Sequence, residues 1–80
     1  MSTTLITPAQ CRAARSLVDM DQVDLARRAV VSRNVIVDFE RGSRTPLANN
    51  LAAIKRALEE SGVEFTNGDQ PGVRLRKGAS

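Results

Sequence analysis

The side chains best suited to recognising another molecule stand together between residues 33 and 38. Arg33 and Asn34 are adjacent, and Val37 and Asp38 follow one helical turn later. An arginine can pair bidentately with guanine and an asparagine with adenine, so Arg33 and Asn34 could read base edges. Val37 could pack on a thymine methyl group, and Asp38 could accept a hydrogen bond from cytosine or orient a neighbouring arginine. On one face of a helix, these four side chains indicate base contacts in double-stranded DNA.

Positive charge is concentrated around the same stretch. The window from residue 27 to residue 44 has five arginines against two acidic residues, and its net charge of +3 equals that of the whole chain of 80 residues. The arginines are Arg27, Arg28, Arg33, Arg41 and Arg44. Except for Arg33, any one of them fits a solvated surface charge as well as a phosphate contact. As a cluster beside residues 33–41 they favour DNA.

The composition excludes most enzymatic and metal-binding functions. The chain has no His, Trp or Tyr, and Cys11 is its one cysteine. Zinc sites of the Cys/His kind, a disulfide framework and Ser–His or Cys–His catalytic pairs are therefore ruled out. Asp19, Asp21 and Asp24 lack the glycine and the distal glutamate of a calcium loop, and helix capping explains Asp21 and Asp24 better. We expect no catalysis, no cofactor and no metal, and we interpret Cys11 as a small buried apolar residue.

Nothing in the sequence indicates a membrane segment or a secretion signal. The longest uninterrupted apolar run, residues 51–54, has four residues, whereas a membrane-spanning helix needs about 20. The first seven residues have neither the basic region nor the hydrophobic core of a signal peptide. The sequence predicts a cytoplasmic protein without membrane contact, associated with the nucleoid through DNA.

Apolar periodicity and capping residues predict a mainly α fold. Four helices are expected, over about residues 8–18, 22–29 and 33–41, and from between 46 and 50 to about 61. The expected N-caps are Thr7, Asp21 and Ser32, and the expected helix stops are Gly42 and Gly62. Alternating residues in 63–66 and 73–76 predict a C-terminal β-hairpin. The expected organisation is a flexible tail at 1–6, a helical domain at 7–62, the hairpin at 63–77 and a frayed end at 78–80.

The same periodicity predicts which side chains the helices bury. Leu17 and Val18 end the apolar stripe of the first helix, and Leu47 begins the stripe of the last one. Asn49 and Asn50 stand where the last helix begins, and we interpret them as capping residues rather than base contacts, with a phosphate contact as the alternative.

A two-turn helix, a short turn and a second short helix with a polar outer face form a helix-turn-helix arrangement over about residues 22–41. This stretch resembles the Cro/C1 (XRE) class of phage-repressor-type DNA-binding domains, and the resemblance extends over about residues 8–62. The residues that carry it are Gln22, Leu25, Ala26, Val31, Ser32, Ile36, Glu40, Gly42 and Pro46. The resemblance implies a four-helix lambda-repressor-like domain, which the hairpin would follow.

The resemblance also implies roles for individual residues. It places the base-contacting side chains, which are Arg33, Asn34, Val37 and Asp38, on the recognition helix. The expected phosphate contacts are Gln22, Ser32, Arg28, Arg41 and Arg44. Arg15 and Glu40 match an ion pair that ties the helices of such domains together, so we interpret them as structural.

One residue departs from the family pattern. The turn glycine of the family is Val30 in this chain. That position usually has a positive φ, which costs a β-branched residue on the order of 1 kcal/mol. Either the turn is altered locally or packing absorbs the strain.

The predicted hairpin must bury its apolar side chains, because an isolated two-stranded hairpin is marginally stable. These side chains are Val63, Phe65, Val73 and Leu75. They could cover the last helix, or the hairpin edge could pair with a second chain. Because DNA-binding domains of this kind commonly read two half-sites about 34 Å apart, we expect a homodimer with the hairpin as its interface.

The sequence thus predicts a sequence-specific regulator that binds double-stranded DNA, acting as a dimeric repressor on a palindromic operator. An alternative is an antitoxin-type autoregulator that also binds a toxin partner through its tail. A second alternative is a protein-interaction module that has lost DNA binding, against which Arg33, Asn34 and the nearby arginines argue.

Overall fold

The computed structural model describes residues 5–66 and 70–76. The helices are α1 (Pro8–Leu17), α2 (Gln22–Ala29), α3 (Arg33–Glu40) and α4 (Ala48–Glu60), followed by strands β1 (Val63–Thr66) and β2 (Gly72–Leu75). The four helices and the antiparallel hairpin confirm the predicted fold class. None of the helices in these residues is long and apolar enough to cross a membrane.

Local sequence sets the start of α1 and ties it to the hairpin. The Thr7 hydroxyl accepts a hydrogen bond from the Gln10 backbone N–H at 3.0 Å, and the Gln10 side-chain oxygen accepts one from the Thr7 N–H at 2.8 Å. This is the predicted capping box, with Pro8 in the first turn. The Gln10 amide nitrogen also donates to the carbonyls of Thr66 and Gly72, at 3.1 and 3.0 Å. One buried side chain therefore caps a helix and anchors both strands.

All four helices end in a residue with positive φ: Asp19 at 53°, Val30 at 59°, Gly42 at 77° and Gly62 at 106°. After the first three of these, the next residue's N–H reaches back five residues to a carbonyl, as in a Schellman motif. At Val30 the turn is therefore not altered. The Val30 side chain is 87% exposed, so packing does not absorb the strain either, and the N–H bonds of Val30 and Val31 to α2 hold the turn.

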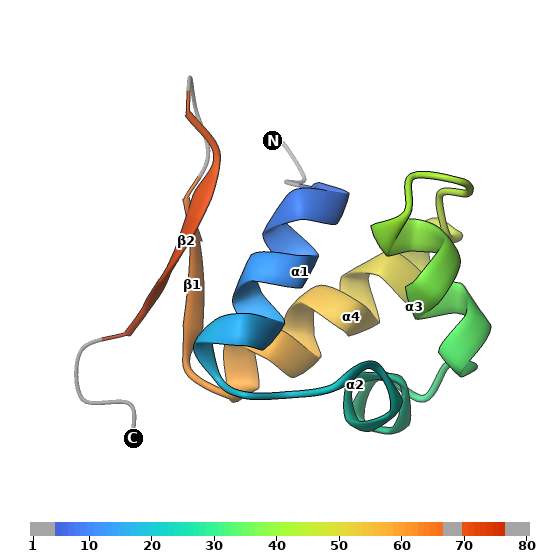
Figure 1. Ribbon diagram of the computed structural model, residues 1–80, viewed down its shortest axis with the longest axis horizontal. Helices are drawn as coiled ribbons and strands as arrows, with labels where there is room; N and C mark the ends of the chain where they lie inside the picture. The colour runs from blue at the N-terminus through green and yellow to red at the C-terminus, as the bar shows by residue number, and fades with distance from the viewer. Residues whose placement is uncertain (1–4, 67–69, 77–80) are drawn as a thin grey trace.

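The core lies where α4 meets α2, α1 and the hairpin (Figure 1). Its largest fully buried side chains are Leu25, Ile36, Ile54, Leu58, Val63 and Cys11. Figure 1 shows α3 and the hairpin at opposite ends of the long axis, with α1 and α4 between them. The longest extent is 31 Å.

Three sequence predictions about apolar residues are wrong. Ile6 does not belong to a flexible tail, because it is buried and packs with Cys11 in the core, as expected of a residue just before an N-cap. Leu47 is 73% exposed because α4 begins only at Ala48, so Leu47 precedes the helix and does not share its stripe. Leu17 is 40% exposed at the last position of α1.

The hairpin packs on its own chain. Val63 pairs with Leu75 and Phe65 with Val73 across the two strands. Val63 is fully buried in the core, and Phe65 and Val73 are half-buried against it, whereas Leu75 is 47% exposed. Val63 is therefore unavailable to a partner, which corrects the predicted interface at that residue. The part of the predicted hairpin at 67–69 and 77, and the tails at 1–4 and 78–80, lie outside the described residues.

Candidate nucleic-acid interface

The α2–turn–α3 unit presents one face of α3 to solvent. The Ser32 hydroxyl caps α3 by accepting a hydrogen bond from the Val35 N–H at 3.4 Å. Ile36 and Phe39 are buried and fix the inner face of the helix. Arg33 and Asn34 are consequently exposed in the first turn.

The second turn of the same face is less open. Val37 and Asp38 are both half-buried. The Asp38 carbonyl accepts hydrogen bonds from the N–H groups of Ser43 and Arg44, at 2.9 and 3.4 Å. These bonds hold the loop after α3 close to the helix, so the four predicted base-contacting residues and Arg44 lie in one region.

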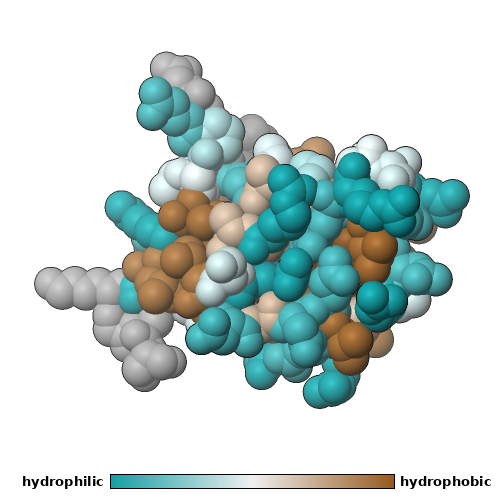
Figure 2. All heavy atoms as spheres, in the orientation of Figure 1, coloured by the Kyte–Doolittle hydropathy of each residue, from teal (hydrophilic) through white to brown (hydrophobic). Residues whose placement is uncertain are grey.

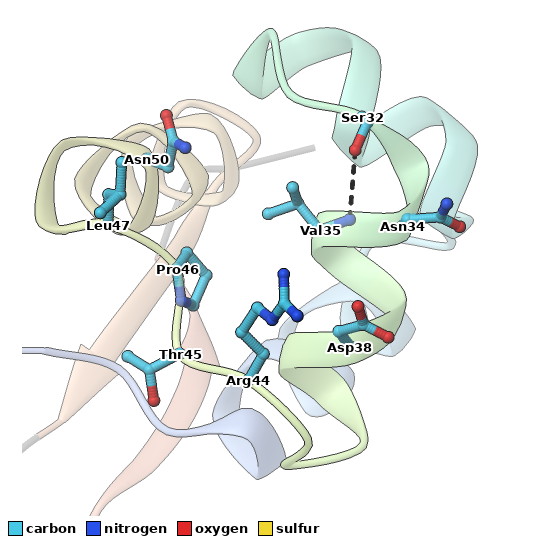
Figure 3. A pocket seen from close by; sticks show the side chains of 9 residues that line it. All are labelled: Ser32, Asn34, Val35, Asp38, Arg44, Thr45, Pro46, Leu47 and Asn50. Atoms are coloured by element: carbon cyan, nitrogen blue, oxygen red, sulfur yellow. Dashed lines mark hydrogen bonds between the residues drawn. The ribbon is translucent and has the colours of Figure 1, made fainter.

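A groove separates the outer face of α3 from the start of α4. It has a volume of about 390 Å³, and its lining comprises Ser32, Asn34, Val35, Asp38, Arg44, Thr45, Pro46, Leu47 and Asn50. Figure 3 shows the Arg44 side chain projecting into this groove between α3 and Pro46. The groove therefore combines apolar walls with polar groups and one cation.

Sequence reasoning missed the α4 side of this groove. Leu47 is the N-cap of α4 and makes no side-chain capping bond, so Asn49 and Asn50 do not have the predicted capping role. Asn50 instead lines the groove. The one signal of this side of the groove in the sequence is the pair of asparagines after Pro46. Their role can be interpreted only once the first residue of α4 is known.

Three arginines around α3 have no acidic partner within the described residues. Arg33 stands at its start, Arg41 at its end and Arg44 in the following loop, and none forms an ion pair there. Free guanidinium groups on an exposed surface are suited to phosphate and to guanine. Arg33, Arg41 and Arg44 therefore remain candidates for the contacts that the charge cluster predicts.

The structure does not bring Arg28 to this surface. Its Nε lies 3.3 Å from the Asp24 carboxylate, one helical turn earlier. It lines a different depression, with the end of α1 and Leu75 of the hairpin. Its place on α2 therefore separates it from the other predicted phosphate contacts.

Behind the interface, α1, α2 and α3 converge on the carboxylate of Glu40. Arg15 donates to it twice, from Nε and Nη2, both at 2.7 Å. The Gln22 amide donates at 3.1 Å and the Cys11 thiol donates at 3.1 Å. The predicted Arg15–Glu40 pair is thus part of a larger network, and Arg12 also donates to the Glu40 carbonyl.

This network determines the protonation of its members. Burial alone would raise the pKa of Glu40, but the hydrogen bonds from Arg15, Cys11 and Gln22 outweigh it and hold that pKa below its usual value. Burial, together with the neighbouring Glu40, raises the pKa of the Cys11 thiol. Gln22 is predicted to bind phosphate. One N–H of its side-chain amide bonds Glu40, which leaves the other N–H for a phosphate.

Comparison with known proteins adds to this geometry. The sequence pattern of a protein family described as helix-turn-helix matches residues 12–65. Among solved structures, the chain is similar to the solution NMR structure of the DNA-binding domain of the P22 C2 repressor, residues 1–76. The TM-score is 0.63 at 30% sequence identity, and the match covers 74% of this chain and 76% of that one. No curated protein sequence matches.

Proposed function

The chain belongs to the Cro/C1-type helix-turn-helix family, and from this membership we propose that it is a DNA-binding transcription regulator with α3 as its recognition helix. The observation that carries the proposal is the pair Arg33 and Asn34, both exposed in the first turn of α3. Arg41 and Arg44 follow this helix without an acidic partner among the described residues. A helix of this kind fits the major groove, where these side chains can reach guanine and adenine. Val37 and Asp38 would contact the next bases.

Phosphate contacts would come from groups around the helix. Ser32 stands at the N-terminus of α3, Arg41 at its end, and Arg44 in the groove beside it. Gln22 would contribute at the start of α2. Arg28 is not included, because it lies with the depression near the hairpin. The protein would act on chromosomal DNA in the cytoplasm, without catalysis or a cofactor.

We propose that regulation is repression by a homodimer on a palindromic operator. The similarity to the DNA-binding domain of a repressor supports the repressor role. The eight residues of α3 support the dimer, because one short recognition helix offers few base contacts and two copies can read half-sites about 34 Å apart. Of the residues predicted to join the copies, Leu75 is exposed and Phe65 and Val73 are half-buried.

The test is selection from random DNA by the wild-type chain and by the Arg33→Ala/Asn34→Ala double variant, at two salt concentrations. We expect an enriched motif that the wild type binds and the double variant loses. Arg56→Ala removes one exposed charge from α4 and is the control, which should keep the motif. An inverted repeat in the motif would support the dimer.

Absence of enrichment, with weak binding that salt abolishes for all three proteins, would contradict sequence-specific regulation. That result would favour a protein-interaction module. An enriched motif without an inverted repeat would support sequence-specific DNA binding and contradict a dimer on a palindromic operator.

A further inference from the structure

An exposed apolar surface lies at the other end of the molecule from α3. Leu17, Val18 and Leu75 contribute apolar side chains to one depression of about 510 Å³ between the end of α1 and β2, whose lining also includes buried Met20 and the polar residues Asp19, Asp24, Arg28, Glu60 and Ser61. Leu17 is 40% and Leu75 is 47% exposed. Figure 2 shows hydrophobic side chains gathered over this part of the surface, beside β2. We call Leu17, Val18 and Leu75 the α1–β2 patch.

The strand next to the patch has a free edge. The Arg76 N–H donates to the Gly62 carbonyl at 2.7 Å, which makes these two residues a hydrogen-bonded pair of the antiparallel ladder. Because such pairs alternate along the strands, Val73 and Leu75 direct their backbone groups away from β1. Among residues 5–66 and 70–76 the sheet has only two strands, so no described strand meets this edge.

The two faces of β2 differ in chemistry. Val73 and Leu75 face the core side, toward α1, as does the patch. Arg74 lies on the opposite face with Arg76, and both are exposed. A strand added along this edge would therefore place alternate side chains on an apolar surface and beside two guanidinium groups.

The inner edge of β2 shows what such a strand looks like. There β1 contributes Val63 and Phe65 to the core side and Glu64 to the other face. The Glu64 carboxylate lies 2.7 Å from Arg74 Nε. The chain thus already pairs β2 with an apolar–acidic–apolar strand.

We propose that the free edge of β2 and the α1–β2 patch bind an extended segment of a partner protein in which apolar and acidic residues alternate. The segment adds a third strand: its backbone bonds Val73 and Leu75, its apolar side chains cover the patch, and its carboxylates face Arg74 and Arg76. This binding leaves α3 free, because α3 lies at the opposite end of the long axis. It occupies the strand edge at which the hairpin is expected to join two copies, so the proposal places the dimer contact elsewhere than this edge.

A second copy of the chain fits this edge less well. Antiparallel pairing of two β2 strands about Arg74 would set Arg74 against its own counterpart and close to the second Arg76. Like charges directly opposite on neighbouring strands are destabilising, and Glu64 is the one acidic residue on that face of the described sheet. Charge complementarity therefore favours an acidic partner strand over self-pairing.

The test is an NMR titration of the full chain with two capped probe peptides, Thr-Val-Glu-Val-Glu-Val-Thr and Thr-Val-Lys-Val-Lys-Val-Thr. We expect saturable shifts of the Val73 and Leu75 amides with the acidic probe and at least tenfold weaker binding of the basic probe. The Arg76→Glu variant should reverse this preference. Leu17→Ser should weaken binding of the acidic probe, and Leu5→Ser, at a 57% exposed leucine elsewhere, should not.

Equal binding of both probes, shifts confined to residues of the α3 groove, or no binding would overturn the proposal. So would shifts of Val73 and Leu75 that appear on raising the protein concentration without peptide, because the occupant would then be a second copy. DNA selection by the same variants separates the two functions: Arg76→Glu and Leu17→Ser should still enrich the wild-type motif.

Discussion

At the scale of single residues, Glu40 is the position on which most depends. Its side chain is 3% exposed, and its partners come from both α1 and α2. A buried carboxylate that loses its charge leaves the opposing guanidinium uncompensated, which costs far more than the loss of an exposed pair. The ion pair therefore holds the helix-turn-helix unit against α1.

We expect Glu40→Gln to lower the free energy of unfolding by about 3 kcal/mol, because it leaves Arg15 without its countercharge. Urea denaturation at neutral pH measures this. The matched control is Glu64→Gln, which breaks the exposed Glu64–Arg74 pair of the same 2.7 Å length and should cost less than about 1 kcal/mol. Equal losses for the two variants would show that burial does not decide the effect.

The lowered pKa of Glu40 predicts loss of stability in acid. The unfolded chain has the usual pKa of about 4.5, and the folded chain has a lower one, so the unfolded state binds more protons in this range. The contribution of ionised Glu40 to the free energy of unfolding is complete above its pKa in the unfolded chain. It is lost as the pH falls through its pKa in the folded chain. Urea midpoints of the wild type should fall over this range more steeply than those of Glu40→Gln, and parallel curves would contradict the assignment.

At the scale of elements, the turn between α2 and α3 has backbone strain at Val30 that a glycine at this position would avoid. Val30 adopts φ 59° and ψ 49° with its side chain in solvent. We expect Val30→Gly to raise the free energy of unfolding by about 1 kcal/mol, since glycine adopts this region without steric cost. Val23→Gly, within α2 and 49% exposed, should lower it by about 0.5 kcal/mol, because glycine has the lower helix propensity. Thermal melts of both variants check the signs.

The recognition helix and its loop should differ in what they contribute to DNA binding. Arg33→Ala should weaken the free energy of binding to the preferred DNA sequence by about 1–3 kcal/mol and relax the base preference at one position. Arg44→Ala should weaken binding to all sequences alike and reduce the slope of log K against log salt by about 1. Titrations of one enriched and one scrambled duplex at several salt concentrations separate the two effects. Base-specific loss with Arg44→Ala would place its guanidinium on a base instead.

Helix caps could be predicted from the sequence because they depend on residues three or four positions apart. Thr7, Asp21 and Ser32 all cap as expected. The bonds from Cys11 and Gln22 to Glu40 could not be predicted, since they join residues 29 and 18 positions apart. The groove beside α3 could not be predicted either, because its two walls come from separate segments, α3 and the start of α4.

At the scale of the whole molecule, the hairpin is held by the helices and is part of one folding unit. Gln10 makes this connection, because its amide donates to carbonyls of both strands while its oxygen caps α1. Gln10→Glu keeps the capping oxygen and removes the donor. We expect it to lower the free energy of unfolding by about 1–3 kcal/mol and to speed amide exchange in β1 and β2 more than in α3. Uniform acceleration, or none, would mean that other contacts hold the hairpin.

The buried thiol of Cys11 has a consequence for how the molecule can be observed. It is fully buried, hydrogen-bonded to Glu40, and the one cysteine in the chain. A thiol reagent can therefore react with it only when the fold opens enough to expose the thiol. The rate of thiol labelling under native conditions then measures how often such openings occur. The wild-type chain therefore reports its own opening without an added label site, in a cell extract as well as in purified form.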